Sequence, residues 1–246
     1  MEPDSTIPST RRRGPPVNRN GDRWIFFDCD STLSAIEGVD ELARMRPASV
    51  FEEVKRLTDQ AMNGEIPLDS VYGRRLAVIR PTAQECARIG QAYIDTIEPT
   101  AVETLKRLRA DGWTVAIISG GFLPAIRPLA EFLGVEVVEA VDLYFAADGS
   151  YLGFDENHPN ARNGGKPEVI RNLRDERGFR TVVMVGDGVS DLETKSEVDL
   201  FIGYGGFTPR EKVRAGAEVF VTRLADVVEA VDRASLTEIR LPSSDF

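Results

Sequence analysis

Four short polar segments of the sequence hold the side chains whose types and spacing could do chemistry. The first places two carboxylates two positions apart, at Asp28 and Asp30. Residues 119–121 are a serine followed by two glycines, and residues 164–166 are two glycines followed by a lysine. Residues 186–191 form a glycine-rich loop with two acids. Mg²⁺ binds through one or two carboxylates, waters and substrate phosphate, and a lysine ammonium supplies positive charge to phosphate oxygens. These segments therefore indicate metal-assisted chemistry on a phosphorylated compound.

Apolar runs with the composition of buried strands accompany these segments. They are rich in β-branched and aromatic residues and cover residues 24–27, 113–118, 181–185 and 200–202, with 218–221 as a weaker candidate. Stretches with helical spacing lie between them, for example 101–110 and 167–173. This alternation predicts an α/β fold with a doubly wound parallel sheet, in which ligands bind beyond the carboxyl ends of the strands.

Each of these segments is a weak signal by itself. They become informative together because they lie at the ends of predicted strands of one sheet. Two acids separated by one residue are expected by chance in a chain with 40 acidic residues, and an isolated lysine such as Lys166 is most often a surface residue. Asp28 and Asp30 also alternate, so their side chains would point apart in an extended strand. We therefore expect the chain to bend or open into a loop directly after residue 27 if both acids face one site.

Residues 39–96 interrupt the alternation of strands and helices. Three amphipathic patterns lie around residues 50–57, 68–79 and 84–94, and no convincing strand accompanies them. An insertion directly after the first strand would lie over the carboxyl end of that strand, so we expect a helical cap. The core then comprises residues 22–38 and 97–232, with a hairpin expected between 143 and 152.

The ends of the chain and its overall charge limit the expected function further. Residues 1–21 have almost no apolar side chains and predict a disordered arm, and 233–246 are expected to form a tail. A net charge of −10 opposes binding to nucleic acid or to an anionic membrane. No stretch approaches the roughly 18 unbroken apolar residues of a membrane span. We expect a cytoplasmic protein with reduced thiols and a small phosphorylated molecule as its partner, while the oligomeric state is not indicated.

Taken in order, the polar segments resemble the haloacid dehalogenase superfamily. Its phosphatases carry DxDxT after the first strand, serine or threonine after the second, a lysine, and then GDxxxD. Further segments resemble the phosphoserine phosphatase family within it, and they are residues 37–43 (EGVDELA), 119–122 (SGGF), 153–155 (GFD), 164–166 (GGK) and 186–188 (GDG). The resemblance covers about residues 24–222. It implies a core of this superfamily with a helical cap, dependence on Mg²⁺, and hydrolysis of O-phospho-L-serine to L-serine and phosphate as the last step of L-serine biosynthesis.

The resemblance implies a role for each of the clustered acids. Asp28 is expected to be the nucleophile that becomes an aspartyl phosphate. Asp30 is expected to protonate the seryl oxygen and then to activate the water that cleaves the intermediate. Mg²⁺ would be held by Asp28, the backbone carbonyl of Asp30 and Asp187, with Asp191 among these ligands or next to them.

The resemblance also assigns the groups that bind the substrate. Ser119, Gly120 and Lys166 would hold the phosphoryl oxygens, with Lys166 counted among the catalytic residues. Glu37 would meet the substrate ammonium and Arg75 the substrate carboxylate. The alternative for Glu37 is a carboxylate favoured at a helix start, and the alternative for Arg75 is an ion pair on the cap surface.

Other functions share part of this pattern. The same aspartyl phosphate could pass its phosphoryl group to an acceptor alcohol such as homoserine, or the substrate could be another small phosphorylated metabolite. The motifs do not distinguish water from an alcohol as the acceptor. A non-catalytic module that binds phosphorylated metabolites belongs to a different class. Such a module has no need for the full set of reactive groups, which are Asp28, Asp30, Lys166, Asp187 and Asp191.

Overall fold

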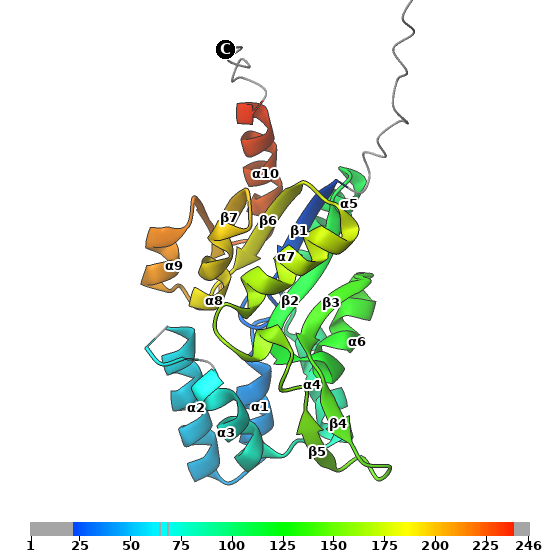
Figure 1. Cartoon of the computed structure of the whole chain (residues 1–246), viewed down its shortest axis with the longest axis vertical. Helices are drawn as coiled ribbons and strands as arrows, with labels where there is room; N and C mark the ends of the chain where they lie inside the picture. Colours follow the sequence, from blue (N-terminus) through cyan, green and yellow to red (C-terminus); the bar gives the residue numbers. More distant parts are fainter. Residues whose placement is uncertain (1–21, 64, 68, 239–246) are drawn as a thin grey trace, which may run out of the picture.

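The centre of the fold is a six-stranded sheet in which every neighbouring pair of strands is parallel. In the order found across the sheet, the strands are β3 (Val137–Val141), β2 (Thr114–Phe122), β1 (Arg23–Phe27), β6 (Thr181–Gly186), β7 (Leu200–Tyr204) and β8 (Val219–Val221). The computed structural model describes residues 22–63, 65–67 and 69–238 (Figure 1). Because β1 lies between β2 and β6, the polar segments at the carboxyl ends of these three strands lie next to one another, and the one at 119–121 is part of β2 itself. The predicted α/β fold with a doubly wound parallel sheet is confirmed.

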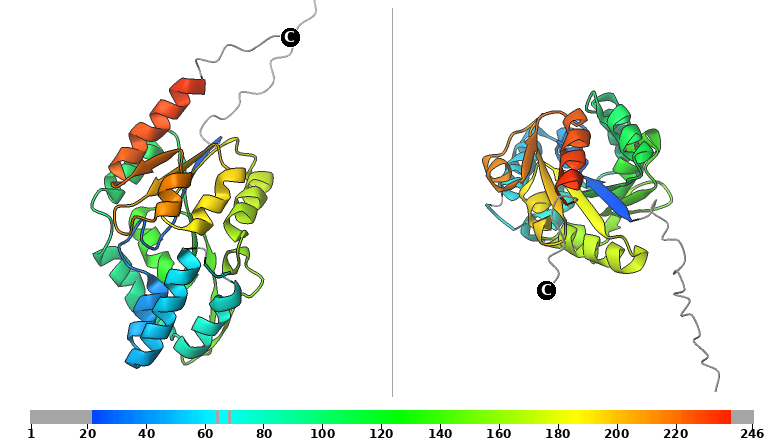
Figure 2. Two further views of the ribbon diagram at one scale, coloured as in Figure 1. Left: turned by 90° about the vertical axis from the view of Figure 1, so that its left-hand side faces the viewer. Right: turned by 90° about the horizontal axis from the view of Figure 1, so that it is seen from above.

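Helices cover both faces of the sheet because side chains alternate along its strands (Figure 2). On β1, Trp24 and Phe26 pack into one apolar cluster, whereas Ile25 and Phe27 pack into another. The helices over the first cluster are α7 (Gly165–Arg177) and α9 (Glu211–Gly216). Those over the second are α5 (Ala101–Ala110), α6 (Leu123–Leu133) and α10 (Ala225–Glu238). Strands buried on both faces have nearly continuous apolar sequences, which is the pattern that identifies them.

Some boundaries differ from those expected. β2 continues to Phe122, four residues past the expected end, and the helix expected over 167–173 extends from Gly165 to Arg177. That helix ends at Gly178, whose φ of 72° lies in the left-handed region that favours glycine. The sequence does not predict β3, because this strand lies at the sheet edge and Glu139 interrupts its apolar pattern.

The segment after β1 forms the helical cap expected from the sequence. Its helices are α1 (Gly38–Arg44), α2 (Ala48–Met62), α3 (Asp69–Ile79) and α4 (Ala83–Asp95). The sequence predicts three of them, and the seven-residue α1 is too short for a periodic pattern. Figure 1 shows the cap at the end of the molecule opposite α10. We propose residues 39 and 96 as its limits.

The predicted hairpin is present and contacts the cap. β4 (Leu143–Phe145) and β5 (Tyr151–Phe154) pair in antiparallel fashion. The Nη2 atom of Arg80 donates to the carbonyl of Tyr151 at 3.3 Å, and the amide of Ala83 donates to the carbonyl of Gly149 at 3.0 Å. The hairpin therefore anchors the segment between α3 and α4 to the core.

The structure tests the prediction for the C-terminal end of the chain in part and does not test the prediction for the N-terminal end. The predicted arm, 1–21, lies outside the described residues. The predicted tail is wrong for residues 233–238, because α10 extends to Glu238. Val227, Ala230 and Val231 bury one face of this helix, and no glycine or proline interrupts it before its end. Residues 239–246 are again outside the described part. Among the described residues, none of the helices combines the length and the apolarity needed to cross a bilayer.

One ion pair joins the start of α2 to the start of α4. Both guanidinium nitrogens Nη1 and Nη2 of Arg46 lie 2.8 Å from the carboxylate of Glu85. Glu85 also caps α4 together with Thr82, and both charged side chains are about one fifth exposed. The hydrogen bonds from Arg46 lower the pKa of Glu85 from 4.5 to about 2.

Glu85→Gln is expected to destabilise the fold at pH 7 by about 1 to 3 kcal/mol, because it removes the negative charge that pairs with Arg46. Glutamine can keep the capping geometry, so the loss reports on the ion pair. The folded-state pKa is depressed, so the stabilisation is complete above pH 4.5 and disappears as the pH falls through about 2. Urea unfolding at pH 7 and pH 3 measures the difference. Glu53→Gln is the control, since its pair with Arg74 spans 3.8 Å between exposed side chains. Equal stability of Glu85→Gln and the unchanged protein at pH 7 would contradict this expectation.

Candidate active site

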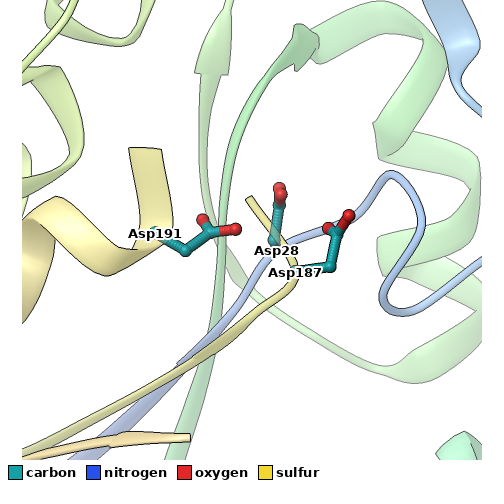
Figure 3. Close-up of side chains that lie close together, drawn as sticks. All are labelled: Asp28, Asp187 and Asp191. Carbon is teal, nitrogen blue, oxygen red and sulfur yellow. The ribbon is translucent and has the colours of Figure 1, made fainter. Parts of the chain in front are cut away.

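Three buried carboxylates meet at the carboxyl ends of β1 and β6. Asp28 follows β1, Asp187 follows β6, and Asp191 comes from the short helix α8 (Val189–Leu192). One oxygen of each lies within 4.8 Å of the others, and Figure 3 shows the side chains side by side. Burial and the charge of Asp28 raise the pKa of Asp187 to about 7 and that of Asp191 to about 8. A hard cation would relieve this repulsion, and the set of oxygen ligands fits a metal ion of that kind.

Lys166 is the positive group of this cluster. Its Nζ atom lies 3.0 Å from Oδ1 of Asp28 and 2.5 Å from Oδ1 of Asp191, and its side chain is 4% exposed. Burial lowers the pKa of Lys166, but the two carboxylates outweigh this effect and raise the pKa above its ordinary value. Lys166 therefore remains an ammonium at neutral pH, beside the candidate nucleophile.

A glycine allows Asp191 to approach the other acids. A methyl group on Gly186 would lie 2.2 Å from Cγ of Asp191. Such contacts do not occur between real atoms, so a larger residue at 186 would displace the carboxylate. The hydroxyl of Thr32 holds the neighbouring acid by donating to Oδ1 of Asp187 at 3.1 Å.

The chain bends directly after β1, as the alternation of its two acids requires. Ser31 has a φ of 51°, in the left-handed region, and Asp28 and Asp30 line the same cavity. Oδ1 of Asp30 accepts hydrogen bonds of 2.6 Å from the amide of Gly38 and from the hydroxyl of Tyr93. Burial and the charge of Asp28 raise the pKa of Asp30 to about 6, against the effect of the Tyr93 hydrogen bond. This carboxyl group is therefore held in one orientation.

The cavity brings together most of the residues predicted from the sequence. Its lining consists of Asp28, Asp30, Glu37, Val39, Thr58, Arg75, Ser119, Gly120, Gly121, Lys166 and Ser190. Asp187 and Asp191 join it through the carboxylate cluster around Asp28. Groups from the core and from the cap thus line one cavity.

Glu37 and Arg75 come to the cavity from opposite sides of the boundary between core and cap. Glu37 immediately precedes α1 and accepts a 2.7 Å hydrogen bond from the hydroxyl of Ser31. Burial and the charges of Asp30 and Asp187 raise its pKa well above the ordinary value. Arg75 lies on α3 and is 5% exposed, which rules out the alternative of a surface ion pair.

Tyr93 and Arg210 are among the residues at the site that were missing from the sequence prediction. Tyr93 lies on α4 among apolar residues, so its helical pattern indicates core packing only. Arg210 precedes α9, and its Nε atom lies 3.2 Å from Oδ2 of Asp187, while Nη2 lies 3.7 Å from Oε1 of Glu37. Its place in the loop after β7, at the same edge of the sheet as the other polar loops, is the signal that could have identified it.

Comparison with known proteins identifies the class that this fold and site define. Residues 25–194 match the haloacid dehalogenase-like hydrolase family. The chain belongs to this family, which includes phosphatases. It is a hydrolase of phosphomonoesters.

Individual relatives identify a narrower family within this class of hydrolases. The phosphoserine phosphatase of Bos taurus is 36% identical over 210 residues, which cover 85% of this chain and 92% of the relative. The phosphoserine phosphatase of Methanocaldococcus jannaschii is 34% identical over 74% of this chain and 85% of its own length. A solved phospho-aspartyl intermediate analogue of phosphoserine phosphatase superposes with a TM-score of 0.70 at 27% identity, covering 86% of this chain and 98% of that one. Within the hydrolase class, the chain belongs to the phosphoserine phosphatase family.

Proposed function

We propose that this protein hydrolyses O-phospho-L-serine to L-serine and phosphate. One observation carries the proposal: a single cavity holds Asp28 and Lys166 together with Glu37 and Arg75. Lys166 suits a phosphate, Glu37 an ammonium and Arg75 a carboxylate, which are the three charged groups of phosphoserine. A solved complex of a phosphoserine phosphatase with bound substrate, 27% identical over 86% of this chain, supports the assignment.

In the proposed reaction, an oxygen of Asp28 attacks phosphorus and the bond from phosphorus to the seryl oxygen breaks. Asp30 gives its proton to the leaving seryl oxygen, so that L-serine departs as a neutral alcohol and Asp28 carries the phosphoryl group. Asp30 then takes a proton from the water that attacks phosphorus, and phosphate leaves Asp28 as a free carboxylate. The hydrogen bonds from Tyr93 and Gly38 keep Asp30 oriented during both steps.

The other polar groups divide between metal and phosphate. We propose Asp28, Asp187 and the backbone carbonyl of Asp30 as the ligands of Mg²⁺, with Asp191 beside them. When bound, the ion supplies positive charge that offsets the negative charge of the phosphoryl oxygens. The second set, Ser119, Gly120 and Lys166, would hold these oxygens as phosphorus moves between the two partners.

Arg75→Ala is expected to raise the KM for phosphoserine about tenfold to hundredfold, because charge-assisted hydrogen bonds to the substrate carboxylate are lost. The value of kcat should change less, since Arg75 does not contact the reacting atoms. Initial rates across phosphoserine concentrations measure both constants. Arg74→Ala is the matched control, because this neighbouring side chain is 62% exposed. An unchanged KM for Arg75→Ala would reject the role of Arg75.

The substrate and the acceptor are tested together by one panel. Phosphate release is measured with phosphoserine, phosphothreonine and other phosphate monoesters in the presence of Mg²⁺, with and without homoserine. We expect phosphoserine to be the preferred substrate and homoserine to leave the yield of phosphate unchanged. Formation of phosphohomoserine would instead support transfer to an alcohol, and no release from any compound would reject the enzymatic proposal.

We further propose that the reaction is the last step of L-serine biosynthesis and takes place in the cytoplasm. The two cysteines, Cys29 and Cys86, are both free thiols, which suits a reducing compartment. The proposed partner is the small phosphomonoester alone, because the net charge of −10 disfavours nucleic acid and anionic membranes. Cell fractionation and the growth of a deletion strain without added serine test location and pathway.

A further inference from the structure

A chain of three buried polar side chains leads from the cavity into the cap. Nη1 of Arg75 donates to Oγ1 of Thr58 at 3.1 Å, and Oγ1 of Thr58 donates to Oδ1 of Asp40 at 2.8 Å. Their exposed fractions are 5%, 3% and 7% in the same order. Each comes from a different helix, α3, α2 and α1, and these helices lie together in the cap (Figure 1).

The direction of these hydrogen bonds follows from what each group can donate. A threonine hydroxyl has one hydrogen, and Asp40 accepts it. The hydroxyl oxygen therefore turns a lone pair toward Arg75, which can only donate. Without Asp40, the hydroxyl of Thr58 would be free to rotate and offer its hydrogen to other acceptors. Asp40 thus fixes Thr58 as an acceptor for Arg75.

Arg75 is held on one side only. Nη1 is engaged by Thr58, and the guanidinium carbon lies 5.5 Å from the centre of the Tyr72 ring. The Nε atom is buried and has no hydrogen-bond partner among the described residues. A buried donor without a partner is rare in folded proteins and is expected where a ligand completes it. A planar guanidinium with one corner anchored has an edge available for a carboxylate.

Asp40 also supplies charge. Burial lowers the pKa of Arg75, and the carboxylate of Asp40 acts in the opposite direction. The groups that face Asp40 in turn are Thr58, Arg75, Lys55 and Asp59. A guanidinium in this position is therefore both oriented and electrostatically supported from inside the cap.

We propose that Thr58 and Asp40 are positioning residues that present the free edge of Arg75 to the substrate carboxylate, and that they thereby set the selectivity for phosphorylated amino acids over phosphate esters without a carboxylate. This inference rests on the proposed function. Neither residue contacts the reacting atoms, so their effect is on recognition and not on the chemical steps.

The test compares two substrates that differ only in this carboxylate, phosphoserine and O-phosphoethanolamine, in the full-length enzyme with Mg²⁺. In Thr58→Val, the ratio of kcat/KM for phosphoserine to that for phosphoethanolamine is expected to fall about tenfold, mainly through the KM for phosphoserine. Thr58→Ser keeps the hydroxyl and is expected to restore the ratio to within about threefold. Asp40→Asn is expected to lower the ratio in the same direction as Thr58→Val. Glu53→Gln, an exposed change on α2, should leave the ratio unchanged.

The ratio is independent of the fraction of enzyme that is folded, so a partly unfolded variant still gives a valid result. Equal losses for both substrates in Thr58→Val would show a structural role only and overturn the proposal. An unchanged ratio in both Thr58→Val and Asp40→Asn would overturn it as well. Failure of the proposed function is distinct, because the unchanged enzyme itself would then fail to prefer phosphoserine over phosphoethanolamine.

Discussion

Asp28→Asn is expected to lower kcat for every phosphomonoester by about 10⁴-fold or more, the largest effect of any single substitution. The amide keeps the shape of the side chain but lacks the anionic oxygen that attacks phosphorus. The fold should persist, because the change removes one of three buried carboxylates that repel one another. Single-turnover and steady-state assays of phosphate release measure the loss.

The control for this substitution is Asp232→Asn, on the exposed surface of α10 at the end of the molecule opposite the cap (Figure 1). Its turnover should equal that of the unchanged protein. Comparable unfolding curves for the two variants would separate loss of chemistry from loss of structure. Normal turnover in Asp28→Asn would show that another group is the nucleophile, even if phosphoserine is the substrate.

Asp30→Asn is expected to lower kcat for phosphoserine by about 10²- to 10⁴-fold, since the amide can neither give nor take the proton. The amide oxygen can still accept the hydrogen bonds from Gly38 and Tyr93, so the side chain should keep its position. The effect should depend on the leaving group. With p-nitrophenyl phosphate, which releases a stable phenolate, the first step needs little proton transfer, while attack by water remains slow.

This difference gives a kinetic signature for Asp30. Asp30→Asn with p-nitrophenyl phosphate should show a rapid burst of nitrophenolate, equal to one per enzyme, followed by slow turnover. Stopped-flow absorbance measures the burst. The unchanged enzyme is the reference for the slow phase, and Asp28→Asn should show no burst. Equal slowing of the two steps in Asp30→Asn, with no burst, would contradict a role for Asp30 in cleaving the intermediate.

The main features of the fold could be predicted because they depend on patterns within short segments. Strands with two buried faces, such as β1 and β6, are continuous apolar runs, and the long cap helices have apolar stripes. β3 and α1 lack such patterns, one because it lies at an edge and the other because it has only two turns. The sequence did not predict that α10 extends beyond residue 232, although no glycine or proline interrupts the helix before Glu238.

The residues of the site also divide into those that could be predicted from the sequence and those that could not. The motif residues could be predicted because the ends of neighbouring parallel strands must meet. The residues that orient these motif residues could not be predicted. They contact the motif residues from distant positions in the sequence, and the sequence does not show which helix surfaces pack together. Tyr93 reaches Asp30 across 63 residues, and Arg75 meets Thr58 only because α2 and α3 pack together. From the sequence alone, a tyrosine or threonine on an amphipathic helix is equally compatible with core packing.

The proposed mechanism requires a covalent bond between the carboxylate of Asp28 and the phosphoryl group. The enzyme is mixed with phosphoserine and Mg²⁺, turnover is stopped in acid, and the position of any phosphoryl group is mapped by mass spectrometry of the peptides. We predict a phosphoryl group on Asp28 in the unchanged enzyme and none on the protein in Asp28→Asn. A phosphoryl group on any other side chain, or turnover of phosphoserine by Asp28→Asn at the normal rate, would contradict the account.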